Sequence, residues 1–423
     1  MPETWDGPKG VPVRLTAVGE GYSLPVSSES SVPPPLPAAR EPGTRHAPAR
    51  PSPTSPPEAE RLLVVTASMG SGHDTVAAEL VRRARAAGKE ARVVDVLGLL
   101  PGGLGSGLRG FYRTVVRRAP WVYAGIYDLF LAPGPRPRPS GTPLARLAGG
   151  RLLSLVGEWR PDVVVPVFHL AAQLTGHLRA RGALRVPSAV VVVDFAAHRQ
   201  WLHPGNDLHV CLTDETAREV RRGTGRAAEA TGPVVAPEFF AAGPGTAVWR
   251  RRLERHGGGR PAVLVSAGAW GAGSRLADTA RLLAAHGFLP VVLCGRNERL
   301  RRALSATPGV LTPGWVTDMP ELLHACAALV DNAAGQTAVQ ALAAGLPVVG
   351  HRPLPGHGAE GLRRMAALGV CDHAPDPDAL LRALTRLTAP GAPREERIAA
   401  GRALFRQDPL DLVVRAAGAS RPS

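Results

Sequence analysis

The chain has 423 residues, of which 44% are apolar, so it is long enough for two domains with full hydrophobic cores. No run approaches the roughly 20 apolar residues that a membrane-spanning helix needs, and no signal peptide is expected because the N-terminus lacks an apolar core. The net charge of +15, carried almost wholly by arginine, favours anionic partners such as nucleic acid, an acidic membrane surface or phosphorylated substrates. Four cysteines without CxxC spacing indicate buried thiols in a reducing compartment and no zinc site.

Residues 1–58 are dense in Pro, Ala and Ser and poor in large apolar groups. Such a segment cannot bury enough surface to offset the entropy lost on ordering. We therefore predict a disordered tail over these residues.

From Arg61 onward, apolar runs alternate with helical patterns such as 73–87 and 214–222. Continuous apolar strands that alternate with helices predict a parallel sheet covered on both faces. The expected strands of this first α/β domain, residues 59–240, are 61–66, 91–96, 162–167, 188–195 and 207–212.

A second alternating series follows a Pro- and Gly-rich stretch at 231–247, which is a candidate hinge. It predicts a second α/β domain over residues 241–410, followed by a flexible C-terminus at 411–423. Ligands of doubly wound sheets bind beyond the carboxyl ends of the strands, so the cleft between the two domains is the expected site. The expected strands of this second domain are 261–268, 288–295, 328–333 and 345–351.

Three turns of the second domain fall at strand ends and look suited to an anion. Glycines let the backbone approach a ligand closely, and a helix start offers free N–H groups and positive potential. An arginine at such a turn can grip a phosphate in a bidentate manner. Any one of these turns could equally be a plain strand-to-helix connection, but three together favour nucleotide binding. The residues concerned are Gly268 and Gly271, then Arg296, and finally Gly335, Gln336 and Thr337.

The turn "GSGHDTVAAEL" in the first domain delivers His73 to the first turn of a helix. It is neither a phosphate-binding Walker loop nor a GxGxxG dinucleotide fingerprint. A helix N-terminus disfavours added positive charge, so we expect a neutral imidazole that can accept a proton. Gly70 and Gly72 leave room beside it for a bulky substrate. The alternative is an ordinary capping or loop histidine.

The stretch 193–207 follows another expected strand and carries Asp194, His198, Trp201 and His203. Asp194 could orient a histidine or the acceptor, and His198 is a rival base. We expect Trp201 on the acceptor side. A metal site formed by the aspartate and the two histidines is a further alternative.

Aromatic residues and arginines are interleaved over residues 108–132, although only 4% of the chain is aromatic. Trp and Tyr beside a basic stripe are typical of the headgroup level of an anionic bilayer. The alternative is an amphipathic helix packed on the core with its arginines in water. The residues expected at the acceptor or the membrane are Tyr112, Arg113, Arg117, Trp121 and Tyr123.

Several motifs taken together resemble GT-B glycosyltransferases close to the monogalactosyldiacylglycerol synthases and the bacterial diacylglycerol glucosyltransferases. The resemblance implies the GT-B fold, in which two doubly wound, Rossmann-like domains face a central cleft. The motifs are "GSGH" (70–73), "YRTVVRRAPWVYAGIYDL" (112–129), "VDFAAHRQWLHPGND" (193–207), "GRNERL" (295–300), "GWVTDMPELLHACAALVDNAAGQTAVQALAAGLPVV" (314–349) and "PLPGH" (353–357).

By this resemblance the second domain binds a UDP-sugar, and the turn of His73 carries the catalytic base. The diphosphate would be held by Gly268, Arg296, Gly335, Gln336 and Thr337. Trp315 and Val316 would lie against the uracil, Gln340 near the ribose, and Gly356 and His357 near the sugar. Gly358 and Gly361 stand where the plant enzymes carry an acid and an asparagine.

The leading hypothesis is a hexosyltransferase of glycolipid biosynthesis that moves a hexose from a UDP-sugar to a diacylglycerol-like lipid with inversion. It would be cytoplasmic and peripheral on the inner face of the plasma membrane. No cofactor, bound metal, nucleic acid or obligate protein partner is expected, since the UDP-sugar is a co-substrate. The alternatives are a UDP-sugar transferase acting on a soluble metabolite and a non-catalytic protein that binds a nucleotide sugar or a lipid.

Overall fold

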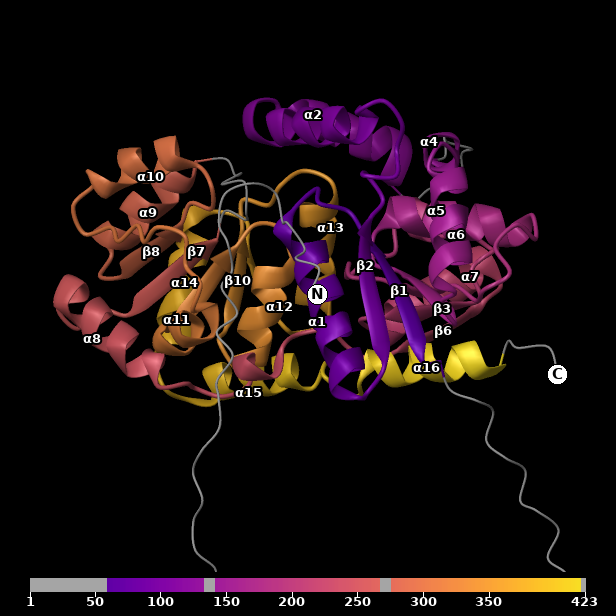
Figure 1. Ribbon diagram of the computed structural model, residues 1–423. Helices are drawn as coiled ribbons and strands as arrows, with labels where there is room; N and C mark the ends of the chain where they lie inside the picture. Colours follow the sequence, from indigo (N-terminus) through magenta and orange to yellow (C-terminus); the bar gives the residue numbers. More distant parts are fainter. Residues whose placement is uncertain (1–58, 133–140, 267–274, 420–423) are drawn as a thin grey trace, which may run out of the picture. The chain divides into compact units, whose positions relative to one another are not determined.

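The computed structural model describes residues 59–132, 141–266 and 275–419, all of which belong to one unit of the chain. The tail expected over residues 1–58 lies outside the described residues. Two parallel sheets organise this unit (Figure 1). We call each sheet with its covering helices a lobe.

The sheet of the first lobe has the strand order β2-β1-β3 followed by β4-β5-β6, with every pairing parallel. A bridge between Val164 and Ser188 joins the two halves. The strands are β1 (Arg61–Thr66), β2 (Glu90–Asp95), β3 (Val163–Pro166), β4 (Ala189–Val191), β5 (Leu208–Cys211) and β6 (Ala227–Ala230).

The sheet of the second lobe has the parallel order β11-β10-β9-β7-β8. Its strands are β7 (Ala262–Ser266), β8 (Leu289–Leu293), β9 (Ala328–Asp331), β10 (Val348–His351) and β11 (Asp372–Ala374). Both sheets are thus parallel and helix-covered, as the alternating pattern of the sequence predicts.

Helices cover both faces of each sheet, which explains why the central strands are apolar throughout. The first lobe contains α1 (Ser71–Ala86), α2 (Leu104–Arg118), α3 (Pro120–Ile126), α4 (Thr142–Arg146), α5 (Gly149–Trp159), α6 (His169–Ala180) and α7 (Asp214–Thr224). The second lobe contains α8 (Gly245–Gly257), α9 (Leu276–Ala285), α10 (Glu298–Ser305), α11 (Met319–Ala325), α12 (Gln336–Ala343), α13 (His357–Ala367), α14 (Pro377–Thr388) and α15 (Ala392–Arg402).

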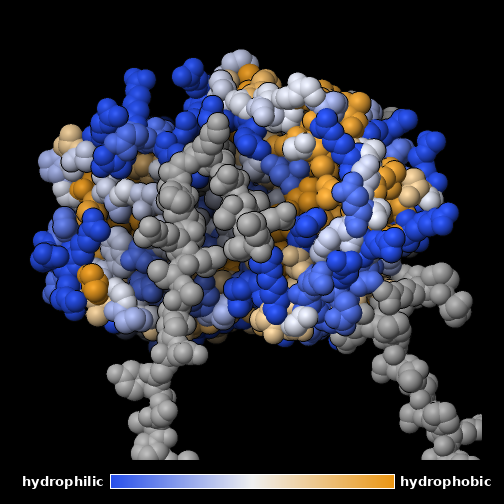
Figure 2. Space-filling view, viewed as in Figure 1, coloured by the Kyte–Doolittle hydropathy of each residue, from blue (hydrophilic) through white to orange (hydrophobic). Residues whose placement is uncertain are grey.

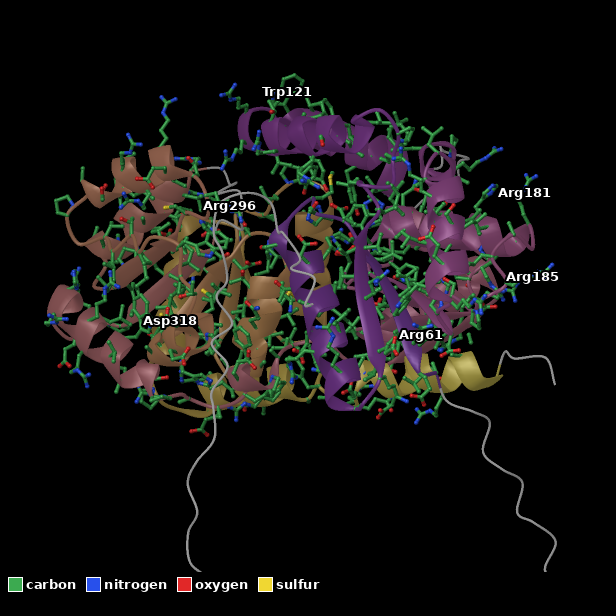
Figure 3. All side chains as sticks on the ribbon, viewed as in Figure 1. Arg61, Trp121, Arg181, Arg185, Arg296 and Asp318 are labelled. Carbon is green, nitrogen blue, oxygen red and sulfur yellow. The ribbon has the colours of Figure 1, made fainter. Side chains whose placement is uncertain are left out.

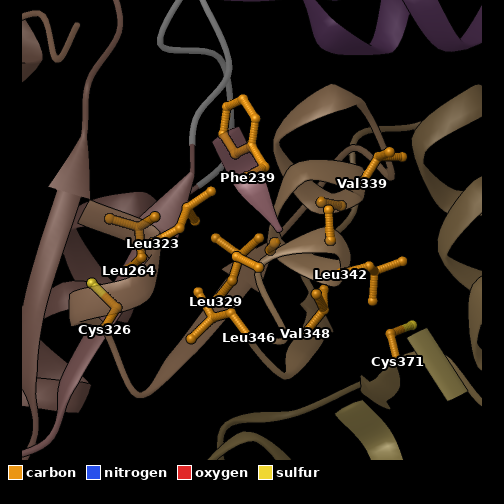
Figure 4. Close-up of a cluster of buried hydrophobic side chains, with 14 of the residues drawn as sticks. Phe239, Leu264, Leu323, Cys326, Leu329, Val339, Leu342, Leu346, Val348 and Cys371 are labelled. Carbon is orange, nitrogen blue, oxygen red and sulfur yellow. The ribbon is translucent and has the colours of Figure 1, made fainter. Parts of the chain in front are cut away.

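A cluster of buried side chains fills one face of the second sheet (Figure 4). Leu264 and Leu329 come from its strands, and Leu323, Val339 and Leu342 from the helices above them. Phe239, from the segment between the lobes, joins the same cluster. The connection between the lobes is therefore anchored in the core of the second lobe.

The C-terminus departs from the prediction of a flexible segment at 411–423, which is wrong for residues 411–419. Helix α16 (Pro409–Ala419) returns to the first lobe, along the lower edge in Figure 1. It is capped by Asp408, whose Oδ1 accepts the N–H of Leu410 at 2.9 Å. Val413 and Val414 are buried against the first sheet, because apolar residues recur at helical spacing.

Two edge strands, β6 and β11, escaped the sequence prediction. Their sequences AAEA and DHA contain no β-branched residue, so only pairing with a neighbouring strand identifies them. Conversely, the segment 188–195, expected to be one strand, forms a strand only over Ala189–Val191.

Candidate functional site

The site lies where the strand order of each sheet reverses. In the first sheet this is between β1 and β3, and in the second between β7 and β9. Loops at such switch points diverge to opposite faces and leave a crevice at the strands' carboxyl ends. A cavity of about 630 Å³ lies between the loops of the two lobes. Its lining includes Gly70, Gly72, His73, His169, Asp194 and His198 from the first lobe, and Ser266, Gly335, Gln336, Thr337 and His357 from the second.

His73 is the third residue of α1, and its ring is fixed across the first switch point. Its Nδ1 lies 2.9 Å from the carbonyl oxygen of Val167, just after β3. Its ring packs edge-on against Phe168 at 4.9 Å between centroids. Because a carbonyl oxygen only accepts hydrogen bonds, Nδ1 must carry the proton. A neutral His73 therefore keeps its lone pair on Nε2, as a general base requires.

Asp194 and His198 lie together at the floor of the cavity. Asp194 Oδ2 accepts the indole N–H of Trp201 at 2.7 Å and lies 3.5 Å from Nε2 of His198. Burial lowers the pKa of His198 well below its usual value, and nearby histidines lower it further. His198 is therefore a neutral imidazole, and only 4% of its surface is exposed.

The position of Trp201 differs from the sequence prediction. It is fully buried, so the expected contact with an acceptor or a membrane is wrong. Its ring instead packs among His73, His169 and His198, with centroids 5.9–6.4 Å away. The apolar body of an indole fills such a space while its N–H meets a buried partner.

His169 escaped the sequence analysis, although it lines the cavity at the start of α6. Burial lowers its pKa to about 3, helped by His73 and His357. A polar residue directly after the apolar run of β3 was the available signal. The alternative metal site is not assembled: among the described residues, no three His, Cys, Asp or Glu side chains are placed to hold an ion. His203 lies elsewhere, where its Nδ1 accepts the N–H of Gly205.

The second lobe contributes a turn built around the carboxylate of Asp331. This group accepts the N–H groups of Ala333 and Ala334, at 2.9 and 2.6 Å. The turn leads into α12, whose N-terminus at Gly335 and Thr337 opens into the cavity. Gln336 also lines the cavity, but its Nε2 donates to the carbonyl of Val234 in the connection between the lobes, at 2.9 Å. Gly268 and Gly271 lie outside the described residues.

Four residues expected around the nucleotide lie outside the cavity lining of the described residues. The guanidinium of Arg296 stacks over the ring of Trp315 at 5.2 Å, and that ring is 56% exposed. Val316 packs partly on the core, and Gln340 is half-buried within α12. The structure thus brings Arg296 and Trp315 together, and the roles of all four stay predictions.

His357 begins α13 and connects the two lobes. Its Nδ1 lies 2.6 Å from the hydroxyl of Tyr123 in α3. Burial lowers the pKa of His357, against the opposing effect of Asp194. Gly356 precedes it with φ of +80°, and a Cβ there would lie 2.5 Å from the ring of Tyr127. A glycine is therefore needed where α13 meets the first lobe.

Gly358 and Gly361 are packing positions in this chain. A Cβ on Gly358 would lie 2.9 Å from the carbonyl oxygen of Asn332. A Cβ on Gly361 would lie 2.6 Å from the Cβ of Ala334. Helix α13 thus sits directly on the turn that follows β9, and neither position has room for a side chain that could face a sugar.

The residues expected at the acceptor or the membrane divide into two groups. Tyr112 and Tyr123 line the cavity with rings 5.8 Å apart, and burial raises the pKa of Tyr112 to about 12. Trp121 is 74% exposed on the outer side of the α2–α3 hairpin (Figure 3). Arg113 and Arg117 are exposed on the same hairpin.

The two glycines beside His73 also line the cavity, but they differ. A Cβ on Gly70 would meet no atom within 4 Å, as the expected room for a substrate requires. A Cβ on Gly72 would lie 3.5 Å from Cβ of Gln336. Gly72 is therefore a point of close approach between α1 and α12.

Comparisons with known proteins agree with this geometry. Residues 73–235 match the family model of monogalactosyldiacylglycerol (MGDG) synthase. The chain is 24% identical over 359 residues to the processive diacylglycerol beta-glucosyltransferase of Bacillus subtilis, covering 78% of this chain and 87% of that protein. It is also 24% identical over 322 residues to the Bacillus pumilus enzyme of the same name, covering 70% and 78%.

Two solved structures share the fold. The glycosyltransferase SnogD from Streptomyces nogalater superposes with a TM-score of 0.53 at 17% identity, over 85% of this chain and 99% of SnogD. Acinetobacter baumannii MurG superposes with a TM-score of 0.51 at 13% identity, over 84% and 98%. These matches support the family assignment expected from the sequence, and the shared fold is that of GT-B glycosyltransferases.

For this glycosyltransferase, the GT-B fold and the enzyme class expected from the sequence, a hexosyltransferase, are confirmed, and the expected family is supported. The segment that matches the family model begins at His73, the residue whose ring is fixed across the first switch point. This segment ends at Val235, next to Val234, whose carbonyl oxygen accepts the hydrogen bond from Gln336. The matched segment therefore spans the first lobe from the cavity to the connection between the lobes.

Proposed function

We propose that this glycosyltransferase moves a hexose from a UDP-sugar to the hydroxyl of a diacylglycerol-like lipid, with inversion. One observation carries the proposal: the bond from His73 to Val167 holds a proton-accepting nitrogen in the cavity that the N-terminus of α12 also enters. A base and an anion site face each other across one space, as direct displacement at a sugar carbon requires.

The proposed reaction is a single displacement. Nε2 of His73 takes the proton of the acceptor hydroxyl while that oxygen forms a bond to the anomeric carbon. The bond from this carbon to the phosphate oxygen breaks, and UDP leaves with the electron pair. The free N–H groups at the start of α12 stabilise the leaving diphosphate. Attack from the face opposite the leaving group inverts the anomeric carbon, and no cofactor takes part.

The lining of the cavity supports a lipid acceptor. The side contributed by the α2–α3 hairpin, by the turn that follows it (Tyr127–Leu131) and by α4 is mainly apolar. Hydrocarbon chains gain free energy by leaving water for such a surface, at roughly 0.8 kcal/mol for each buried CH₂ group. The residues concerned are Leu108, Phe111, Val115, Val116, Ile126, Phe130, Leu131 and Leu144.

The outer surface of the hairpin supports docking on an anionic membrane, on the inner face of the plasma membrane. Phe111 and Trp121 are 53% and 74% exposed. Figure 2 shows apolar side chains gathered near the hairpin, with charged residues around them. The described residues contain no helix long and apolar enough to cross a bilayer. Trp121→Ala should weaken binding to phosphatidylglycerol vesicles several-fold, whereas Val248→Ala, an exposed site on α8, should not.

The test of the function is a donor and acceptor screen. The protein is mixed with UDP-glucose, UDP-galactose or UDP-N-acetylglucosamine and with vesicles that contain diacylglycerol, and the lipids are read by mass spectrometry. We expect a glycolipid from one of these donors. NMR should show that its anomeric configuration is opposite to that of the donor. Product on water-soluble alcohols alone would overturn the lipid acceptor. Tight UDP binding without any product would indicate a non-catalytic protein.

A further inference from the structure

Asp194 is a carboxylate of the first lobe that lines the cavity beside the proposed base. Burial raises the pKa of Tyr112, Tyr123 and Tyr127, and the negative charge of Asp194 adds to this rise. Burial lowers the pKa of His357, and the same charge opposes that shift. Positive charge develops on the sugar carbon and on His73 as the proposed displacement proceeds. A fixed carboxylate in the same cavity stabilises this charge only if it does not have to reorient.

Trp201 is the group that fixes this carboxylate. Its indole N–H donates to Oδ2 at 2.7 Å, and the side chain is fully buried. Its ring is held among the rings of His73, His169 and His198, so the donor has little freedom to move. Trp201 lies behind Asp194 and is not among the described residues that line the cavity.

We propose that Trp201 is a positioning residue that holds Asp194 in the orientation the sugar transfer needs. This inference rests on the proposed function. A hydrogen bond to a charged group contributes more than one between neutral groups, and the carboxylate of Asp194 is only partly exposed, so loss of this bond is not fully replaced by water. Without the indole N–H, the carboxylate can turn toward His198, whose Nε2 lies 3.5 Å from the same oxygen.

The chain contains a matched control for this pair. Trp249 in α8 donates its indole N–H to Oδ2 of Asp318 at 2.6 Å, and Trp249 is also buried. Asp318 lies in the second lobe (Figure 3), just before α11, and neither residue lines the cavity. The same chemical bond is therefore present once beside the site and once away from it.

The first experiment compares Trp201→Phe with Trp249→Phe in the glycolipid assay, after a thermal melt has shown that both are folded. Trp201→Phe should lower kcat on the order of ten- to a hundredfold and leave the KM for the donor within about twofold. Trp249→Phe should leave both constants within about twofold. In an Asp194→Ala background, Trp201→Phe should have no further effect. An unchanged kcat in Trp201→Phe overturns the inference. So does a Trp201→Phe substitution that lowers kcat as much in the Asp194→Ala background as in wild type.

A second measurement does not depend on activity or on the folding of Trp201→Phe. The indole groups of the seven tryptophans are labelled with ¹⁵N in wild type and in Asp194→Ala, and their N–H exchange is followed by NMR. One slowly exchanging indole should exchange at least about tenfold faster in the variant, because the acceptor of this buried N–H is gone. Identical exchange in both proteins overturns the inference. A wild type that makes no glycolipid overturns the proposed function instead.

Discussion

The two switch points have the same architecture but present different chemistry to the cavity. In the first lobe, side chains face it: His73 bonded to a carbonyl, and Asp194 bonded to an indole. In the second lobe, the N-terminus of α12 faces it beside Thr337 and His357, and Asp331 shapes the turn before that helix. We infer that the first lobe supplies proton transfer and that the second supplies anion binding. Substitutions in the first lobe should therefore lower turnover. The second lobe should tolerate substitutions with little loss of function.

The largest expected effect is that of His73→Ala. Loss of a general base should lower kcat by about two to four orders of magnitude. Affinity for UDP, measured by calorimetry, should stay within about twofold because the second lobe is untouched. His256→Ala is the control, since this exposed histidine makes the same kind of bond, from Nδ1 to the carbonyl of Arg252 at 2.8 Å. A His73→Ala variant with normal turnover removes the assignment of the base.

The next effect concerns stability in acid. The pKa of His169 is about 3 in the folded protein and near 6.5 when unfolded. Between these values the unfolded chain binds one more proton, so stability falls as the pH drops from 6.5 toward 3, by about 1.4 kcal/mol per pH unit for this group. His169→Gln should remove this contribution to the pH dependence of the free energy of unfolding between pH 7 and 5, which urea unfolding measures. His286→Gln, at an exposed position, should leave the slope unchanged.

A smaller effect is expected where the two lobes meet. Tyr123→Phe removes the hydroxyl that lies 2.6 Å from Nδ1 of His357. Loss of one such bond should lower kcat/KM for the donor about two- to tenfold. Tyr112→Phe is the matched control, because its ring contacts Tyr123 while its hydroxyl makes no hydrogen bond among the described residues. Equal effects of the two variants would argue against a role for the cross-lobe bond.

The smallest effect is predicted for Gly335→Ala. Its φ of −95° suits any residue, and an added Cβ would meet no atom within 4 Å. If the second lobe binds the diphosphate through backbone N–H groups, UDP affinity should change by less than about threefold. A large loss of UDP binding would show that the ligand needs a close approach to this glycine, and the contrast between the lobes would be weaker than we infer.

The sequence was sufficient for the features that depend on local pattern. Apolar runs alternating with helical segments gave two parallel sheets, because buried parallel strands are apolar on both faces. The turn around His73 and the turn before α12 were both recognised from glycines at strand ends. Short edge strands such as β6, with the sequence AAEA, were missed because their pairing is not encoded locally.

Only the tertiary structure decided which residues meet. Trp201 was expected on the acceptor side, but it is buried behind Asp194, because its burial depends on β1, β3 and α6 converging at one sheet edge. The bond between Tyr123 and His357 joins positions 234 residues apart. Helix α16 packs on the first sheet although the helices of the second lobe all precede it in the sequence. Periodicity reports which face of an element is apolar, whereas the partner of that face is set by how the two lobes pack.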